Sequence, residues 1–503
     1  MVGDGTLGRY GTVSRETCLC GDAGRSQSLH STVAVLAARS AESKAELRKG
    51  RQEGGCVKSR DRQCIYSNVP PVPHCGGAKQ GAEAWEWVEA SIWTDRMLAA
   101  LENGVKGGKW FSLIDKVKRL KTLEMAWRKV ARNKGAAGVD GQSIKRFEHN
   151  AAQYLEELSQ ELTAGTYRPQ PVKRVEIPKG PGKTRPLGIP AVKDRIVQTA
   201  LKMVIEPIFE SEFVESSYGF RPGRGCKDAL REVDQLIKQG FTHVVDADMA
   251  SYFDTIPHDR LMALVEQRIS DGRILDLIRG YLEQDVISGM QRWTPVGGTP
   301  QGAVISPLLA NLYLHPLDRL MRAKGYRMVR YADDFVVMCP SLEAAQSAHA
   351  EIRSWVSDNG LTLHPDKTHI GDCSEPGQGF EFLGYRFEAG NRWVRKKSLN
   401  AFRNRVRSKT KRSRGDSMAT IIESLNPMLC GWFNYFKHAN PYVFRSVDGF
   451  IRRRLRAILR KQRKRPGMGR CRADHQRWPN AFFADLGLFT MTEAHSSASR
   501  SRC

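Results

Sequence analysis

The sequence predicts an α/β fold followed by a helical C-terminal region, on three observations. Short β-prone runs flank residues 331–334, and another lies at 242–247. Before both of these runs, apolar residues recur at helical spacing, as Val197, Leu201, Val204 and Ile208 do. Three further helical patterns follow at 398–412, 417–438 and 442–465.

Two adjacent carboxylates, Asp333 and Asp334, stand between the runs Val329–Arg330 and Phe335–Met338. Two β-prone runs around an acidic pair predict a hairpin with the carboxylates at its tip. Metal-assisted phosphoryl transfer needs oxygen ligands that hold two cations about 3.5–4 Å apart. The pair therefore predicts part of a site for two Mg²⁺ ions, whereas an isolated tetrapeptide of this kind could also be a solvated turn.

A third carboxylate is available in the run 242–248. A strand there carries Asp248 to the edge of a sheet, but Asp246 and Asp248 share a strand face, so alternation does not choose between them. Alternation also puts Asp333 and Asp334 on opposite sides unless the turn twists, which makes Asp333 the surer direct ligand.

Two Gly/Pro-rich segments predict a nucleotide site. Residues 298–302 form a turn before a helix that begins near Val304, and glycine there permits close approach of a nucleotide. Residues 178–190 predict a hairpin with basic side chains that can clamp a triphosphate. The alternative for this hairpin is an ordinary exposed turn.

In chain order, these motifs resemble those of bacterial group II intron-encoded reverse transcriptases and maturases. The resemblance extends from about residue 122 to 488 and favours Asp248 as the metal ligand, with Asp246 as a supporting charge. The motifs that carry it are Arg174–Pro190, Ser217–Gly225, Asp248–Asp254, Pro300–Asn311, Tyr331–Asp334, Gly360–Lys367 and Phe382–Tyr385.

The resemblance implies an α/β right-hand polymerase, with fingers and palm, followed by an α-helical thumb and maturase domain. Such an enzyme is an RNA-directed DNA polymerase that also binds intron RNA to assist splicing and mobility. The implied parts are a disordered extension at 1–85, an N-terminal extension at 86–150, fingers and palm at 151–390, thumb and maturase at 395–470, and a basic and aromatic tail without endonuclease at 471–503.

The resemblance also implies the site residues. Asp248, Asp333 and Asp334 are the expected catalytic and metal-binding residues, with two Mg²⁺ ions as cofactor. Phe253 is expected to select against a 2′-hydroxyl, unless it is a core residue, and Lys367 to protonate pyrophosphate, unless it is a surface lysine. The expected dNTP contacts are Lys183, Arg185, Phe253, Gln301, Gly302 and Lys367.

Charge supports a polyanionic partner. The 503-residue chain has a formal net charge of +25 and a pI near 9.7. Lys and Arg dominate residues 451–465, where Leu455, Ile458 and Leu459 still provide an apolar stripe. The arginines expected to bind RNA are Arg452, Arg453, Arg456 and Arg460, whereas Trp432, Tyr435 and Phe436 are expected in the core.

The expected partners are group II intron RNA, an RNA template with a DNA primer, dNTPs and target DNA. No association with a membrane is expected, and a homodimer is possible. No apolar run approaches the roughly 18 residues that span a bilayer. The scattered cysteines predict free thiols in a reducing cytosol rather than a zinc site. The expected location is the bacterial cytoplasm, in a ribonucleoprotein. The alternatives are a defence-associated or domesticated reverse transcriptase and an RNA-binding splicing factor.

Overall fold

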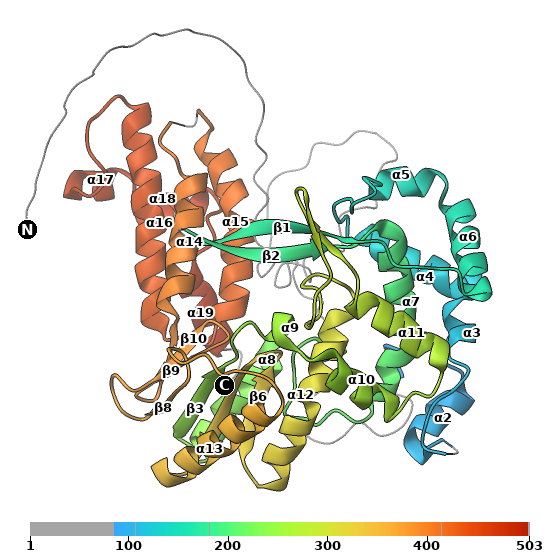
Figure 1. Ribbon diagram of the computed structural model, residues 1–503. Coiled ribbons are helices and arrows are strands. Elements are labelled where there is room, and N and C mark those ends of the chain that lie inside the picture. Colours follow the sequence, from blue (N-terminus) through green and yellow to red (C-terminus); the bar gives the residue numbers. More distant parts are fainter. Residues whose placement is uncertain (1–84, 106, 181, 414, 501–503) are drawn as a thin grey trace, which may run out of the picture. The chain divides into compact units, whose positions relative to one another are not determined.

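The computed structural model describes residues 85–500, apart from 106, 181 and 414 (Figure 1), and all of them fall in one unit, 49–503. The expectation for residues 1–84 lies outside the described residues. No helix in the described part of the chain is long and apolar enough to cross a membrane.

The predicted acidic hairpin forms the edge of a four-stranded sheet, which we call the central sheet. Its order is β6 (Arg327–Tyr331), β7 (Asp334–Cys339), β3 (His243–Asp248) and β8 (His369–Asp372). All three pairings are antiparallel. The strand expected at 242–247 therefore exists, but it extends through Asp248.

The two faces of the central sheet belong to two hydrophobic cores. Val245 and Phe335 enter the first core, with α12 (Ser306–Ala323), α13 (Leu342–Asp358) and most of the helices before residue 283. Val244 and Val336 enter the second core, with α8 (Cys226–Lys238) and the C-terminal helices. Because side chains alternate along a strand, each residue's parity decides which core it faces.

The first core contains the long helices that the apolar periodicity predicts. The expected helix at 194–209 is α7 (Val192–Glu210), and the expected helix after Val304 is α12 (Ser306–Ala323). The other helices of this part of the chain, including α8 of the second core, are α2 (Asp95–Asn103), α3 (Ile114–Val117), α4 (Leu120–Arg132), α5 (Ile144–His149), α6 (Ala151–Ala164), α8 (Cys226–Lys238), α9 (Tyr252–Thr255), α10 (His258–Glu266), α11 (Gly272–Leu282) and α13 (Leu342–Asp358).

The predicted basic hairpin is present as β1 (Val172–Gly180) and β2 (Lys183–Ile189), which pair antiparallel. They join β4 (Val286–Ser288) and β5 (Gln291–Trp293) in a second sheet of order β2-β1-β4-β5. A third sheet has the order β11-β10-β9. Its strands are β9 (Phe380–Phe382), β10 (Tyr385–Glu388) and β11 (Asn391–Val394).

The three predicted C-terminal helices are α14 (Lys396–Lys409), α15 (Met418–Phe436) and α16 (Pro441–Gln462). As expected, the aromatic residues of α15 pack inward: Trp432 stacks on Phe402 at 4.4 Å between ring centroids. The residues after α16 form α17 (Arg472–Arg477), α18 (Asn480–Asp485) and α19 (Met491–Arg500). The Asp448 carboxylate on α16 accepts from the backbone N–H of Thr492 at 2.9 Å, which fixes the start of α19.

One fully buried ion pair joins the central sheet to α12. The Arg330 guanidinium donates to both Asp318 oxygens, at 2.7 and 2.5 Å, and neither side chain is exposed. It also donates to the Asn311 side-chain oxygen at 3.0 Å and to the Ala332 carbonyl at 2.9 Å. A buried charge of this kind is tolerated only when its donors are satisfied, as they are here.

Arg330→Met should cost about 3–5 kcal/mol of unfolding free energy, because it leaves the Asp318 carboxylate buried without a partner. The double variant Arg330→Met/Asp318→Leu should recover part of that loss. The measurement is urea unfolding, with Arg322→Met on the exposed side of α12 as a control within about 0.5 kcal/mol of wild type. A loss for Arg330→Met no larger than the control's would contradict this account.

Candidate active site and nucleic-acid interface

The three predicted aspartates meet at one end of the central sheet. In the β3–β7 register, Asp248 stands directly opposite Asp334. Opposed residues of an antiparallel pair share a face, and alternation adds Asp246 to that face. Asp333 occupies the two-residue turn between β6 and β7, after Ala332 at φ +61°. The turn therefore brings Asp333 to the same edge.

Charge is concentrated at this edge. Burial, followed by the charges of Asp246, Asp333 and Asp248, raises the pKa of Asp334 to about 8. Burial also raises the pKa of Asp246 to about 6. Burial and the charge of Asp248 raise the pKa of Asp333, which the cations Arg185 and Lys179 partly offset. Asp333 thus lies within the field of the β1–β2 hairpin as well as that of Asp248.

The Gly360–Lys367 motif packs against the end of β3. The backbone N–H of His364 donates to the Asp248 carbonyl at 2.8 Å, and Met249 bridges to Leu363. The Lys367 ammonium contacts the Asp248 carboxylate in an ion pair. The lysine expected at the triphosphate therefore neutralises one of the aspartates.

The aspartates suit a divalent cation in their chemistry. They offer only carboxylate oxygens, the ligands that Mg²⁺ prefers, and a cation would offset the burial and the repulsion that together raise the pKa of Asp334. Among the described residues, however, no three His, Cys, Asp or Glu side chains already lie close enough together to hold a metal ion. The donor set fits the ion, while its ligand sphere is not preassembled.

Three of the six predicted nucleotide contacts, Arg185, Gln301 and Gly302, lie together between β2 and the start of α12. The Arg185 guanidinium donates to the Gln301 side-chain oxygen at 2.9 Å, and the Gln301 amide donates to Asp254 at 3.3 Å. Gly302 has φ +114°, and a Cβ there would lie 2.4 Å from the Gly188 carbonyl oxygen. Only glycine fits this close crossing of the two segments.

Two other predicted nucleotide contacts, Phe253 and Lys183, are not shown to join this group. Phe253 is buried in the first core, edge-on to Tyr252, and its carbonyl accepts from the Thr299 N–H at 2.6 Å. The backbone of Lys183 begins β2, and its side chain lies outside the described part of the structure.

Sequence reasoning assigns no role to Arg330, although this residue positions the acidic turn. Its bond to the Ala332 carbonyl fixes the residue before Asp333. The segment before α8 adds a second support: the Tyr218 N–H donates to the Arg330 carbonyl at 2.8 Å, and the Asn311 amide donates to the Gly219 carbonyl at 2.7 Å. The available signal was an arginine placed after Met328 and Val329, three residues before an acidic pair.

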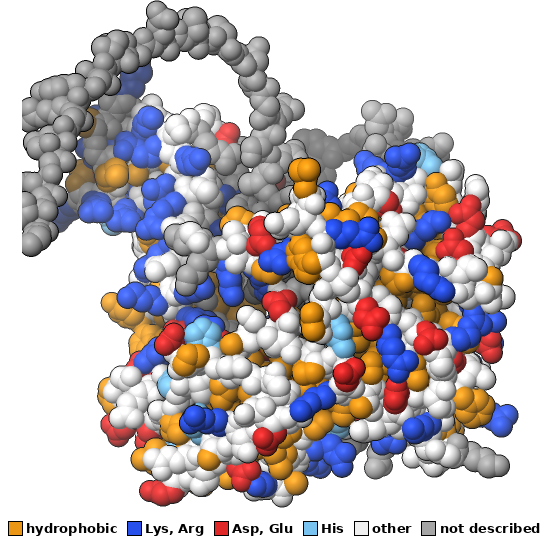
Figure 2. Space-filling view, viewed as in Figure 1, with side chains coloured by type: hydrophobic (Ala, Val, Ile, Leu, Met, Phe, Trp, Pro, Cys, Tyr) orange, Lys and Arg blue, Asp and Glu red, His pale blue; other side chains and the backbone are white. Residues whose placement is uncertain are grey.

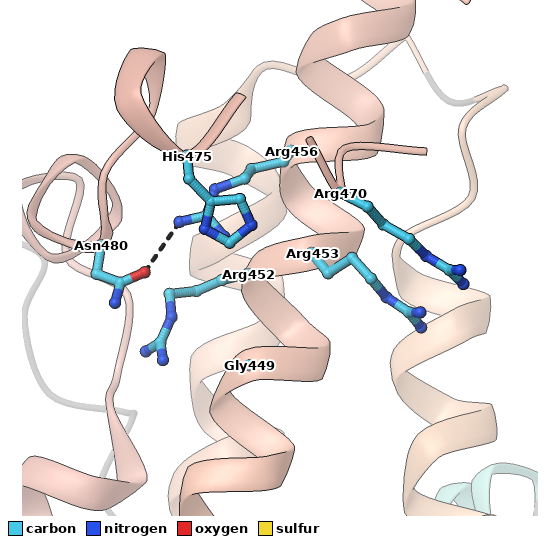
Figure 3. A pocket seen from close by; sticks show the side chains of 7 residues that line it. All are labelled: Gly449, Arg452, Arg453, Arg456, Arg470, His475 and Asn480. Atoms are coloured by element: carbon cyan, nitrogen blue, oxygen red, sulfur yellow. Dashed lines mark hydrogen bonds between the residues drawn. The ribbon is translucent and has the colours of Figure 1, made fainter. Parts of the chain in front are cut away.

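The four arginines expected to bind RNA separate into two pairs. Arg452 and Arg453 are partly exposed on α16. Arg456 is buried and donates to the Trp478 carbonyl and the Asn480 side chain, both at 2.9 Å, as Figure 3 shows for Asn480. Arg460 pairs with Asp474 at 2.8 Å. Figure 2 shows Lys and Arg side chains gathered over these C-terminal helices.

An acidic hairpin beside a third aspartate, faced by an arginine-bearing hairpin, defines a nucleotidyl-transferring polymerase. The family described as "Reverse transcriptase (RNA-dependent DNA polymerase)" matches residues 177–387. The family described as "Group II intron, maturase-specific domain" matches residues 399–478. The chain belongs to the group II intron reverse transcriptases with a maturase domain, and its enzyme class is RNA-directed DNA polymerase.

Curated relatives agree with this membership. Protein YkfC of Escherichia coli (strain K12) is 38% identical over 306 residues, which cover 52% of this chain and 79% of that protein. Group II intron-encoded protein LtrA of Lactococcus lactis subsp. cremoris is 36% identical over 200 residues, 39% of this chain and 33% of LtrA. The solved partial Cas6-RT-Cas1–Cas2 complex matches 48% of this chain and 41% of its own at 25% identity and a TM-score of 0.33, a score that supports no argument about layout.

Gly219→Ala should disturb the acidic turn, because a Cβ at residue 219 would lie 2.2 Å from the Ala332 backbone nitrogen. A displacement of about 1 Å at a reacting group can lower a rate about 100-fold, so primer extension on an RNA template should fall by that order. Gly431→Ala is the control, since a Cβ there meets nothing within 4 Å. Wild-type extension rates from folded Gly219→Ala protein would remove Gly219 from the support of the turn.

Proposed function

We propose that this chain copies RNA into DNA at the edge of the central sheet formed by Asp248 and Asp333, and binds group II intron RNA through its C-terminal helices to assist splicing and mobility. The observation that carries the polymerase role is the register of β3 and β7, which pairs Asp248 with Asp334 beside the Asp333 turn. The maturase match at 399–478 and the basic surface of α14 and α16 support the RNA role.

In this proposal the parts of the polymerase correspond to the sheets and helices described above. The β1–β2 hairpin serves as fingers, the central sheet as palm, and α14–α16 as thumb. The segment 86–150 is the N-terminal extension, fingers and palm occupy 151–390, and thumb and maturase occupy 395–470. Residues from 471 onward form a basic and aromatic segment that follows the thumb and maturase region.

Asp248 and Asp333 would hold two Mg²⁺ ions, with Asp334 as a third carboxylate. Such ions activate the attacking hydroxyl and stabilise the leaving oxygen. The protein contributes position and charge: Arg330 holds the turn, and Lys367 neutralises Asp248 and offers a proton for pyrophosphate. Burial and the neighbouring carboxylates raise the pKa of Asp334 to about 8, and a cation held here would favour its ionised form.

The incoming dNTP would lie between the hairpin and the turn before α12. Arg185, joined to Gln301, provides a guanidinium that can bind phosphate through two hydrogen bonds. Gly302 permits close approach of the backbone, Lys183 adds charge, and Phe253 would exclude a 2′-hydroxyl. The other partners would be an RNA template, a DNA primer and target DNA, in a ribonucleoprotein of the bacterial cytoplasm.

Asp248→Asn and Asp333→Asn should each lower primer extension more than about 100-fold, equivalent to about 2.7 kcal/mol in barrier height. The reason is that each change removes an anionic metal ligand with little change of shape. Extension of a DNA primer on an RNA template is the measurement, and RNA binding should persist in both variants.

Asp276→Asn provides the matched control, because Asp276 is an exposed carboxylate on α11. It should extend primers as wild type does. Near-normal extension by either active-site variant would contradict the assignment of the aspartates.

A further inference from the structure

A cavity of about 310 Å³ lies beside α16, where the segment after this helix folds back onto it. A water molecule takes about 30 Å³ in the liquid, so the cavity has room for a phosphate group. No lining residue is acidic. The cavity is lined by Gly449, Arg452, Arg453, Arg456, Arg470, His475 and Asn480.

The cations continue from this cavity onto α14. The guanidinium carbons of Arg403, Arg407 and Arg453 lie 6.0, 5.5 and 5.4 Å from the centre of the Phe450 ring. Two of these arginines belong to α14 and one to α16, so Phe450 gathers positive charge from two helices. Figure 3 shows Arg453 and Arg470 extending in the same direction.

Among residues 85–500 as the structure describes them, these cations lack a carboxylate partner. Partial burial, and then the charges of nearby arginines with Arg470 first, lower the pKa of Arg453. We call Arg403, Arg407, Arg452, Arg453 and Arg470 the cation site. In the described part of the chain, no ion pair with a carboxylate involves any of its members. Like charges that converge without a partner raise the free energy of the unbound protein.

Arg456 and Arg460 differ from the cation site because their side chains are already occupied. Arg456 bonds the backbone of Trp478, and Arg460 pairs with Asp474. Both therefore hold the segment of α17 and α18 against α16. This arrangement brings Arg470 and His475 to the cavity and leaves Arg452 and Arg453 to face it.

We propose that the cation site binds successive phosphates of an RNA backbone, an assignment that rests on the proposed RNA-binding function and locates it. A guanidinium can bind a phosphate through two parallel hydrogen bonds. The site extends over two helices and the segment that follows them. Its five arginines carry more positive charge than one phosphate neutralises. Gly449 presents no side chain, and a Cβ there would meet nothing within 4 Å, so a backbone can approach.

The test compares two double variants of the full chain, each of which removes two positive charges. Arg453→Gln/Arg470→Gln removes one cation from each wall of the cation site. Arg445→Gln/Lys461→Gln removes two exposed cations from α16 outside the cavity. Binding to a structured group II intron RNA is measured by filter retention over a series of NaCl concentrations.

Each neutralised phosphate contributes about 0.7–0.9 to the slope of log K against log salt, so loss of two contacts should make the slope shallower by about 1.4–1.8. The control slope should change less. Without RNA, the Arg453→Gln/Arg470→Gln variant should have a melting temperature no lower than that of wild type, because a repulsion between like charges has been removed. A structural role alone would lower its melting temperature instead.

The outcomes separate this proposal from the proposed function. If wild type does not bind the RNA, the RNA-binding function fails. If wild type binds and both double variants have the same slope, only the cation site is wrong. A DNA duplex of equal length is the second probe, and a loss as large for DNA as for RNA would contradict the assignment to RNA. Should the double variant unfold, Arg470→Gln alone, an exposed substitution, serves for the same comparison.

Discussion

The buried ion pair between Arg330 and Asp318 governs the geometry of the acidic edge. It ties β6 to α12, and the same guanidinium reaches the Ala332 carbonyl inside the turn. Ala332 has φ +61°, a conformation that a residue with a Cβ adopts only when its surroundings hold it. Gly219 packs directly against this backbone, so the turn is fixed from two sides. Asp333 owes its position to that support rather than to local sequence preference.

The same support that fixes the turn holds the aspartates close together, where they repel one another. Asp246, Asp248 and Asp334 share a face because of strand alternation and register, and the turn adds Asp333. Without a cation, burial and neighbouring charge raise the pKa of Asp334, and Lys367 pairs with Asp248. On the proposed assignment, a divalent cation bound at this edge would offset the cost of burying these carboxylates next to one another. The proposed cation site on the C-terminal helices follows the same reasoning, because its arginines form no ion pair with a carboxylate among the described residues.

Local patterns predicted the elements well and the long-range contacts poorly. The acidic hairpin, α7, α12 and the three C-terminal helices follow from turn residues and apolar periodicity alone. Alternation put Asp333 and Asp334 on opposite sides unless the turn twists. It did not show that Asp334 lies opposite Asp248, because the pairing of β7 with β3 is set by tertiary packing. The role of Arg330 was missed since a charged residue in a strand pattern indicates an exposed position. On α16, composition identified a cationic helix but could not say that Arg456 is buried or that Arg460 pairs with Asp474.

The most direct test of the account is extension of a DNA primer on an RNA template by the purified wild-type chain. The account predicts template-dependent DNA synthesis from dNTPs that stops when EDTA removes divalent ions and resumes when Mg²⁺ is restored in excess. It also predicts little synthesis when rNTPs replace dNTPs. A folded protein that binds the primer and template but extends nothing at any Mg²⁺ concentration would contradict the central claim that this edge of the sheet is a polymerase active site.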